Sequence, residues 1–315
     1  MFYYEVLPAD SRYRGGELTY SYEKELPLRS VVSVPLRARR VTAFVVKKVS
    51  KPDFAVKPVA AVNSASPLPA HCLELADWLA QYYGCSLGEA LAQFAPSKPS
   101  VRRTNLTGAP HEVEGVGQIA LDLPLTDEQS AVVTRISRSA ETTHLLHGET
   151  GSGKTRVYLE LAKKALGVNQ SAILLTPEIS LTAQLAKAVR QLGCPVFVFH
   201  SRLSVAARKK IWFEILECGQ PAVVIGPRSA LFSPLAAIGL IVLDEAHEPA
   251  YKQEQSPRYH AGRVASKLGQ LTGAKVVLGT ATPLAADYYL ASRRGQVIRM
   301  AKPALPAAVI PQVEI

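Results

Sequence analysis

The stretch GETGSGKT at residues 148–155 constrains the fold more than any other part of the chain. It follows the apolar residues HLLH and precedes TRVYLELAKKAL, which has the apolar spacing of a helix. A strand, a glycine-rich turn and a helix in this order form a phosphate-binding P-loop, in which glycines let the backbone fold tightly and its N–H groups converge. We therefore expect a nucleotide-binding α/β domain and not a chance glycine-rich turn.

The residue types of this stretch predict an ATP site. Lys154 is expected to reach the β- and γ-phosphates and to act in catalysis, and the hydroxyl of Thr155 is expected to ligate Mg²⁺. The other expected ATP-binding residues are Gly148, Glu149, Thr150, Gly151, Ser152 and Gly153. Gln129, in LTDEQSAVV, is a further candidate, because its carboxamide offers one donor and one acceptor to the adenine edge. A solvent-facing glutamine on a helix is the alternative.

Short apolar runs alternate with helical stretches through the second part of the chain. They are THLLHG, SAILLTPE, PVFVFH, PAVVIGPRS, LIVLDEAH and KVVLGTATP. Such a rhythm predicts a parallel sheet that helices cover on both faces. Each polar cluster begins where an apolar run stops, and ligands bind at the carboxyl ends of parallel strands. One edge of the sheet is therefore expected to carry the chemistry.

Two carboxylates follow the run LIVL and complete the expected catalytic set. Asp244 is assigned to Mg²⁺ through water, and Glu245 is assigned as the base that polarises the attacking water. An N-cap pair that starts a helix is the alternative. His247 has either a packing or capping role, or it hydrogen-bonds to GTATP and couples the sites. The coupling candidates are His247, Gly279, Thr280 and Thr282.

The first part of the chain differs in pattern. Residues 31–50 alternate β-branched residues with charges and predict two strands joined by a basic turn, and residues 71–96 have helical spacing. A Pro-, Gly-, Ser- and Thr-rich stretch follows. We therefore expect a small β-rich DNA-binding domain at 1–96, a linker without a winged helix at 97–121, and a nucleotide-binding lobe at 122–315.

The charge balance favours an anionic partner. The chain carries 36 Lys and Arg against 26 Asp and Glu, a formal net charge of +10. Residues 29–57 hold eight Lys or Arg and one acid, so this segment is a candidate polyanion contact through Arg37, Arg39 and Arg40. The four cysteines form no CxxC pair, and no apolar run is long enough to span a membrane. We expect a reduced cytoplasmic protein.

The motifs GETGSGKT, DEAH and GTATP resemble motifs I, II and III of superfamily-two helicases. More narrowly, LLTPEISLTAQ, GPRSALFSP, DEAHEPAYKQEQSPRYH and VVLGTATP resemble the PriA family of bacterial primosomal replication-restart helicases, most densely over residues 125–283. The resemblance implies a RecA-like lobe with ATP and Mg²⁺, and a 3′-to-5′ motor on forked and single-stranded DNA. It also implies other primosome proteins, a replicative helicase loader and a single-strand-binding protein as partners.

The resemblance also implies DNA contacts in the lobe. Where the family's first lobe grips the DNA backbone, this chain has Thr176, Pro177, Glu178, Gly226, Arg228 and Ser229. Short polar residues and one arginine at strand ends can hold phosphates without reading bases. A surface salt bridge is the alternative for Arg228. The aromatic-rich loop, which in the family couples DNA binding to hydrolysis, is matched by Tyr251, Lys252, Arg258, Tyr259 and His260. Aromatic faces among cations suit base stacking.

The chain departs from the family pattern at several positions. Thr19 replaces an Asp that the family associates with the 3′ end of the nascent strand, and Pro257 replaces an aromatic residue. No arginine motif of a second motor lobe follows GTATP, and the eight zinc-binding cysteines of the family are absent, so both are expected only in a missing carboxyl-terminal part. We expect one lobe alone to bind nucleotide and to hydrolyse it poorly, because an arginine finger contributes roughly 10³ to 10⁵ in rate.

The expected function is thus the amino-terminal portion of an ATP-dependent 3′-to-5′ DNA helicase of replication restart. Two alternatives stay open. One is a catalytically incomplete, truncated relative that acts as a DNA-binding adaptor. The other is a different superfamily-two DNA translocase, which would share the P-loop and the DEAH sequence.

Overall fold

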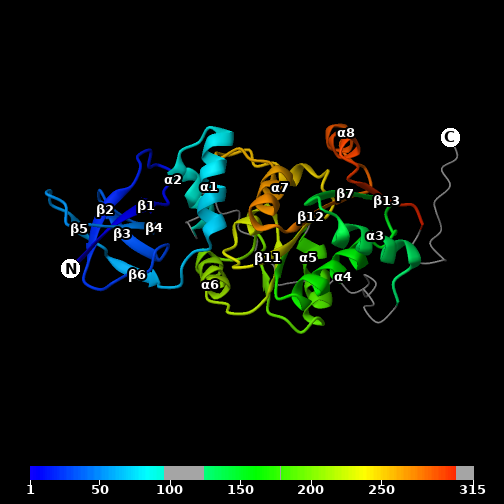
Figure 1. Ribbon diagram of the computed structural model, residues 1–315, viewed down its shortest axis with the longest axis horizontal. Helices are drawn as coiled ribbons and strands as arrows, with labels where there is room; N and C mark the ends of the chain where they lie inside the picture. Colours follow the sequence, from blue (N-terminus) through cyan, green and yellow to red (C-terminus); the bar gives the residue numbers. More distant parts are fainter. Residues whose placement is uncertain (96–123, 178, 303–315) are drawn as a thin grey trace.

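The computed structural model describes residues 1–95, 124–177 and 179–302. The expected linker at 97–121 and the candidate DNA contact Glu178 lie outside these residues. Two sheets organise the described chain, and Figure 1 shows them at opposite ends of an elongated molecule with α1 and α2 between them. Among the described residues, no helix is both long and apolar enough to cross a membrane.

The amino-terminal sheet is built from short strands, which confirms the expected β-rich module. Its spatial order is β5-β2-β1-β4-β3-β6. The strands are β1 (Phe2–Pro8), β2 (Leu18–Tyr22), β3 (Val31–Leu36), β4 (Arg39–Val49), β5 (Lys57–Pro58) and β6 (Ala61–Ser64). The predicted basic turn joins β3 to β4, and Arg37 adopts a φ of 55° there. The sheet encloses a small core of its own, which includes Tyr4, Val34 and Val45.

Two helices follow, α1 (Ala70–Tyr83) and α2 (Leu87–Phe94). The expected helical stretch is interrupted because Gly84 ends α1 in the left-handed region, at a φ of 64°. Ser86 then opens α2 through a capping box with Glu89. Buried side chains of both helices, such as Leu79 and Phe94, belong to the same core as residues of the second sheet. The helices therefore join the two parts of the molecule.

The second sheet has seven strands in the order β13-β7-β12-β11-β8-β10-β9, and every pairing in it is parallel. The strands are β7 (Thr143–Gly148), β8 (Ser171–Leu175), β9 (Val196–Val198), β10 (Val223–Gly226), β11 (Ile238–Leu243), β12 (Lys275–Thr280) and β13 (Val297–Met300). Each of the six apolar runs forms one of these strands, so the predicted parallel sheet is confirmed. The edge strand β13 was not predicted.

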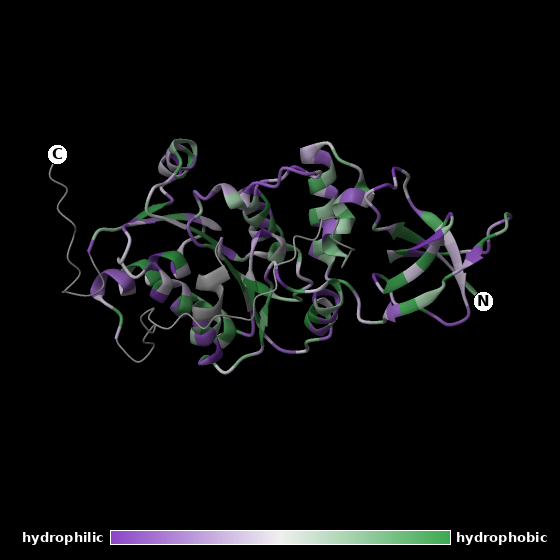
Figure 2. Ribbon diagram, turned by 180° about the vertical axis from the view of Figure 1, so that it is seen from behind, coloured by the Kyte–Doolittle hydropathy of each residue, from purple (hydrophilic) through white to green (hydrophobic). Residues whose placement is uncertain are grey.

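Helices cover both faces of this sheet, as expected for near-continuous apolar strands. They are α3 (Asp127–Arg138), α4 (Lys154–Gly167), α5 (Ile179–Arg190), α6 (Val205–Leu216), α7 (Ala261–Thr272) and α8 (Ala285–Arg293), with 3₁₀ turns η1 (Arg228–Phe232) and η2 (Pro249–Tyr251). Successive strand residues point to opposite faces. In β8, Ile173 and Leu175 pack in the core with α7, whereas Ala172 and Leu174 pack in the core with α3 and α4. Figure 2 shows the hydrophobic strands between these helices.

Candidate functional site

The strand order places the predicted motifs side by side along the carboxyl edge of the parallel sheet. The P-loop follows β7, Thr280 ends β12, Asp244 follows β11, Thr176 follows β8, and Arg228 lies just after β10. In space these strands are neighbours in that order. The residues expected to bind nucleotide therefore occupy one half of the edge, and the residues expected to bind DNA occupy the other half. Asp244 lies where the two halves meet.

The P-loop has the backbone that a phosphate site needs. Gly151 and Gly153 have φ values of 81° and 82°, in the region that favours glycine. A Cβ on Gly148 would lie 2.7 Å from the Oγ of Ser152. The side chain of Ser152 thus occupies the space next to Gly148. That Oγ is buried and has no hydrogen-bond partner among the described residues. Buried polar groups are normally satisfied, so this hydroxyl fits a site built for phosphate oxygens.

Lys154 begins α4 and is buried at the mouth of the loop. Its Nζ donates to the carbonyl oxygens of Gly148, at 2.8 Å, and Glu149, at 3.3 Å. The same Nζ lies 3.9 Å from Oε1 of Glu245. The ammonium group is thus held between the P-loop and the DEAH sequence, within reach of groups from both. Thr155 is half-buried in the first turn of the same helix.

Asp244 lies at the end of β11 and is held by several hydrogen bonds. Its Oδ1 accepts from the hydroxyl of Tyr158 at 3.1 Å, its N–H donates to the carbonyl of Leu175 at 3.0 Å, and its carbonyl accepts from the hydroxyl of Tyr251 at 2.6 Å. Burial and the neighbouring carboxylate of Glu245 raise the pKa of Asp244. Glu245 itself has a φ of 46°. The two adjacent carboxylates repel each other, and a divalent cation would offset their charge. The pair therefore fits a site for such a cation.

Within the described ranges, no group of three or more His, Cys, Asp or Glu side chains forms a metal cluster. A magnesium–nucleotide site needs fewer protein ligands, because Mg²⁺ keeps several waters and binds the phosphates. Thr155 and Asp244 supply a hydroxyl and a carboxylate of that kind. The residues present therefore fit Mg²⁺ bound together with a nucleotide.

The DEAH and GTATP sequences are hydrogen-bonded to each other. Nδ1 of His247 lies 2.8 Å from Oγ1 of Thr280, and the N–H of Ala246 donates to the carbonyl of Gly279 at 2.8 Å. Oγ1 of Thr280 also accepts from the N–H of Thr282 at 3.1 Å. The contact that the sequence suggested for His247 is therefore present, and a pure capping role is not what the structure shows.

Gln129 is buried, so the solvent-facing alternative is wrong. Its Oε1 accepts from the N–H of Thr126 at 3.0 Å, and its own N–H donates to Oγ1 of Thr126 at 3.2 Å. The two residues form the capping box that starts α3. The acceptor of the carboxamide is thus engaged, and the adenine contact expected from the sequence would have to use its NH₂ group.

The residues expected to grip the DNA backbone differ in their exposure. Thr176 is buried, and its N–H donates to the carbonyl of Gly226 at 3.0 Å. Pro177 is half-buried and Ser229 is exposed. Arg228 is half-buried and donates to the carbonyl of Ala250 and to the side-chain oxygen of Gln253. The salt bridge considered for Arg228 is not found among the described residues, and the arginine instead anchors the segment that follows DEAH.

That segment departs from the sequence expectation. Tyr251 and Tyr259 are buried, at 1% and 2% exposure, so their rings cannot stack on bases in this structure. Tyr259 packs against Phe232, with ring centroids 5.2 Å apart. Phe94 of α2 also packs against Phe232, with ring centroids 5.1 Å apart, so Tyr259 contributes to an aromatic core and not to an exposed face. The exposed cation of the loop is Arg258, while Lys252 donates to the carbonyl of Arg258 at 2.9 Å.

The basic turn of the amino-terminal module is open to solvent. Arg37, Arg39 and Arg40 are exposed. Arg39 forms an ion pair with Asp10 at 3.4 Å. Thr19 lies on β2 and pairs with Glu5 of β1. The turn thus presents three cations, one of which is partly neutralised by a neighbouring carboxylate.

Two tyrosines contact the site although the sequence did not single them out as site residues. Tyr158 lies one turn after Lys154 on α4, and this spacing of four residues puts both side chains on the same face of the helix. Tyr83, at the end of α1, accepts a hydrogen bond from the N–H of His260 at 3.2 Å. The first could have been found from helical spacing, whereas the second depends on a contact between distant segments.

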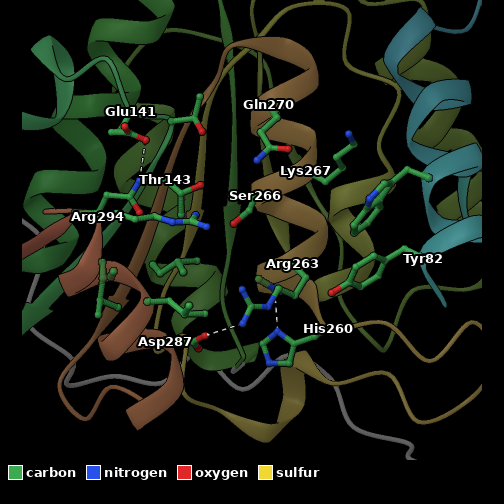
Figure 3. A pocket seen from close by; sticks show the side chains of 18 residues that line it. Tyr82, Glu141, Thr143, His260, Arg263, Ser266, Lys267, Gln270, Asp287 and Arg294 are labelled. Carbon is green, nitrogen blue, oxygen red and sulfur yellow. Dashed lines mark hydrogen bonds and ion pairs between the residues drawn. The ribbon is translucent and has the colours of Figure 1, made fainter.

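A separate cleft of about 460 Å³ lies between α1, α7 and α8. Figure 3 shows Tyr82 on one side of it, Arg263 and Lys267 along α7, and Asp287 and Arg294 on the opposite side. Arg263 and Asp287 form an ion pair at 3.5 Å across it. None of the residues that line the cleft belongs to the nucleotide site described above.

Family profiles match both parts of the chain. The family described as "DEAD/DEAH box helicase" matches residues 126–288, which is more than half of the chain, and the "3′DNA-binding domain" of PriA matches residues 11–96. A solved structure, the helicase domain of Hef from Pyrococcus furiosus, matches 56% of this chain and 38% of its own with 21% identity and a TM-score of 0.41.

Curated relatives extend over both parts. Replication restart protein PriA of Helicobacter pylori strain 26695 is 33% identical over 289 residues, which cover 91% of this chain and 44% of the relative. PriA of Bacillus subtilis is 40% identical over 198 residues, 61% of this chain and 24% of the relative. The chain spans less than half the length of these relatives. It belongs to the DEAD/DEAH box helicases, a family of ATP-dependent enzymes, and it is a relative of the replication restart protein PriA.

Proposed function

We propose that this chain forms the portion of an ATP-dependent 3′-to-5′ DNA helicase of replication restart that holds ATP–Mg²⁺ and binds forked and single-stranded DNA. One observation carries the proposal. At the carboxyl edge of the parallel sheet, Nζ of Lys154 lies 3.9 Å from Oε1 of Glu245, next to Asp244, and Arg228 follows a strand farther along the same edge. Other primosome proteins, a helicase loader and a single-strand-binding protein are the proposed protein partners, on the strength of the kinship with PriA. We propose the cytoplasm as its location.

The nucleotide side would act by positioning and charge. Lys154 would exchange its carbonyl contacts for the β- and γ-phosphates, and the P-loop N–H groups would surround them. Mg²⁺, when bound, supplies charge compensation for the phosphates. Thr155 and Asp244 would hold it, and Glu245 would orient the attacking water and accept its proton. The carboxylate of Glu245 already lies near Lys154, so base and phosphate-binding cation come from one cluster.

The DNA side would bind the sugar–phosphate backbone and not the bases. Exposed Arg258 and Ser229 and the turn carrying Arg37 and Arg40 are the available polar groups. Cations at such positions give salt-dependent affinity without sequence preference. The tyrosines of the loop would act from inside the protein, by holding its backbone. We propose His247 and Thr280, through their hydrogen bond, as the link between hydrolysis and the DNA side.

The division of the domains is proposed on the same basis. The β module and helices α1 and α2 fall within residues 1–96, and the parallel sheet falls within 122–315. The shared core of α1, α2 and the sheet makes the module a fixed support for DNA next to the lobe. The zinc-binding part expected from the resemblance would lie outside this chain.

Equilibrium binding tests the proposed function. The affinity of the chain for an ATP analogue with Mg²⁺ is measured by calorimetry, and its affinity for forked and single-stranded DNA by fluorescence anisotropy. Lys154→Ala should weaken analogue binding at least about tenfold, or 1.4 kcal/mol, and leave DNA binding in place. Lys163→Ala, which removes an exposed lysine from the same helix, is the matched control.

The outcomes separate the candidate functions. Tighter binding to forks than to single strands favours replication restart over a general translocase. A chain whose salt-sensitive DNA binding is the same with and without the ATP analogue, in the wild type and in Lys154→Ala alike, would be an adaptor that uses ATP only as a structural ligand. Absence of DNA binding by the wild-type chain would contradict the helicase proposal altogether.

A further inference from the structure

Tyr158 is a buried tyrosine that contacts the DEAH carboxylate of Asp244. The proposed mechanism gives it no role. It lies on α4, four residues after Lys154, and is 1% exposed. Its hydroxyl donates to Oδ1 of Asp244 at 3.1 Å. An ionised carboxylate can only accept hydrogen bonds, so the tyrosine hydroxyl is the donor in this pair.

The same hydroxyl lies against the strand that carries GTATP. A Cβ on Gly279 would lie 1.7 Å from Oη and 2.8 Å from Cζ of Tyr158. Real Cβ atoms do not approach other atoms so closely, so the hydroxyl occupies the space in which a side chain at position 279 would stand. The hydroxyl oxygen of Tyr158, on the helix that follows the P-loop, therefore contacts Asp244 and also fills the space beside Gly279.

Among the described residues, two hydrogen-bond donors hold the carboxylate of Asp244. Its backbone is fixed by Leu175 and Tyr251, as described above, but its side chain is held by Tyr158 and by the backbone N–H of Glu245. Loss of the tyrosine hydroxyl would leave one half-buried carboxylate oxygen without this donor. Phenylalanine would keep the ring and its packing, because only the oxygen is removed.

We propose that Tyr158 is a positioning residue, which orients the Asp244 carboxylate toward Mg²⁺ and sets its distance from the GTATP strand at Gly279. This inference rests on the proposed function, since it assumes that the P-loop binds a magnesium–nucleotide complex. It concerns the metal-dependent part of binding only. Nucleotide contacts made by the P-loop backbone and Lys154 do not pass through Tyr158.

The test separates metal-dependent from metal-independent affinity. Calorimetry with an ATP analogue, with Mg²⁺ and with EDTA, compares the wild-type chain with Tyr158→Phe. The expected result is an affinity with Mg²⁺ that is weaker by roughly tenfold or more, as for loss of a hydrogen bond to a charged group, and the same affinity in EDTA. Tyr20→Phe is the control, because Tyr20 is also buried and hydrogen-bonded but lies in the amino-terminal sheet.

A second measurement uses the contact with Gly279. Gly279→Ala should weaken binding with Mg²⁺, because its Cβ would press on the hydroxyl of Tyr158. Tyr158→Phe removes the oxygen atom that comes closest to this Cβ. The affinity of the double variant with Mg²⁺ should therefore fall by less than the product of the two single fold-changes. Circular dichroism and thermal melting establish that each variant is folded.

Several outcomes would overturn the inference. Equal weakening of binding by Tyr158→Phe with Mg²⁺ and with EDTA would make Tyr158 a packing residue. Unchanged affinity in both conditions, or strictly multiplicative effects of the two substitutions, would also reject it. A wild-type chain that binds no nucleotide in either condition would instead reject the proposed function, so the two failures are distinguishable.

Discussion

The hydroxyl of Tyr83, at the end of α1, accepts a hydrogen bond from the backbone N–H of His260 at 3.2 Å. His260 closes the segment that begins after DEAH and contains Tyr251, and Tyr251 in turn donates to the carbonyl of Asp244 at 2.6 Å. The amino-terminal helices are therefore hydrogen-bonded to the same loop that contacts Asp244, in addition to the core that they share with the sheet. Figure 1 shows α1 beside α7 at this junction.

Because α2 shares its core with the parallel sheet, damage to that core should destabilise the lobe as well. Phe94→Ala removes a ring that is 1% exposed and packs on Phe232. We expect a loss of about 3–5 kcal/mol in the free energy of unfolding, as for other buried phenylalanines. Urea denaturation followed by tryptophan fluorescence and circular dichroism measures it. Phe54→Ala, at a residue 60% exposed, should change little. Separate unfolding of an intact lobe would contradict the shared core.

The base role of Glu245 predicts a loss of turnover without a loss of binding. Glu245→Gln keeps the shape of the side chain but removes its proton acceptor, and general-base catalysis typically contributes about 10² to 10⁴ in rate. We expect single-turnover hydrolysis of ATP on single-stranded DNA to slow by about that factor. Glu254→Gln changes an exposed glutamate of the neighbouring loop and serves as the control. Hydrolysis at the wild-type rate would show that another group orients the water.

The basic turn predicts a change in the salt dependence of DNA binding. Each phosphate contact contributes roughly 0.7 to 0.9 to the slope of log affinity against log salt. The double variant Arg37→Ala, Arg40→Ala should therefore weaken DNA binding and lower the slope by about 1.4 to 1.8. Arg39→Ala should lower it less, because Arg39 is paired with Asp10. Anisotropy titrations at several salt concentrations measure the slopes, and an unchanged slope in the double variant would place the DNA elsewhere.

Stability should fall on mild acidification because of His71. Burial lowers the pKa of this histidine from 6.5 to about 4, and its Nε2 has no hydrogen-bond partner among the described residues. The unfolded chain therefore binds the proton more readily than the folded chain. The contribution to stability is complete above about pH 6.5 and is lost as the pH falls through 4. His71→Gln should reduce the change in melting temperature between pH 6.5 and pH 4. An unaltered dependence of melting temperature on pH would show that other groups dominate.

The sequence predicted the parallel sheet well, because six apolar runs were long enough to form buried strands and were separated by helical stretches. It did not predict β13, since VIRM has only four residues and an exposed Arg299 at the edge of the sheet. The helical spacing of residues 71–96 did not show where the helix breaks, which depends on the left-handed Gly84.

The candidate site was predicted unevenly for a physical reason. Lys154 and Asp244 belong to local patterns that follow strands, and parallel strands end at one edge, so their proximity could be expected. Tyr251 and Tyr259 are buried in a core to which α2 also contributes, and α2 is distant from them in sequence. Aromatic residues among cations have the same pattern whether they face a base or a neighbouring helix. Only the packing distinguishes these two environments.

The strand order along the sheet has a consequence for how the two ligands influence each other. From β7, which leads into the P-loop, to β10, which leads to Arg228, there are four strand steps, or roughly 19 Å at about 4.8 Å each. Salt screens charges over about 8 Å under physiological conditions. In the proposed function, a γ-phosphate at the P-loop would therefore exert little direct electrostatic force through solvent on a DNA phosphate at Arg228. We expect communication between them to be mechanical, through displacement of β11, of the hydrogen-bonded pair His247 and Thr280, or of the loop anchored by Arg228.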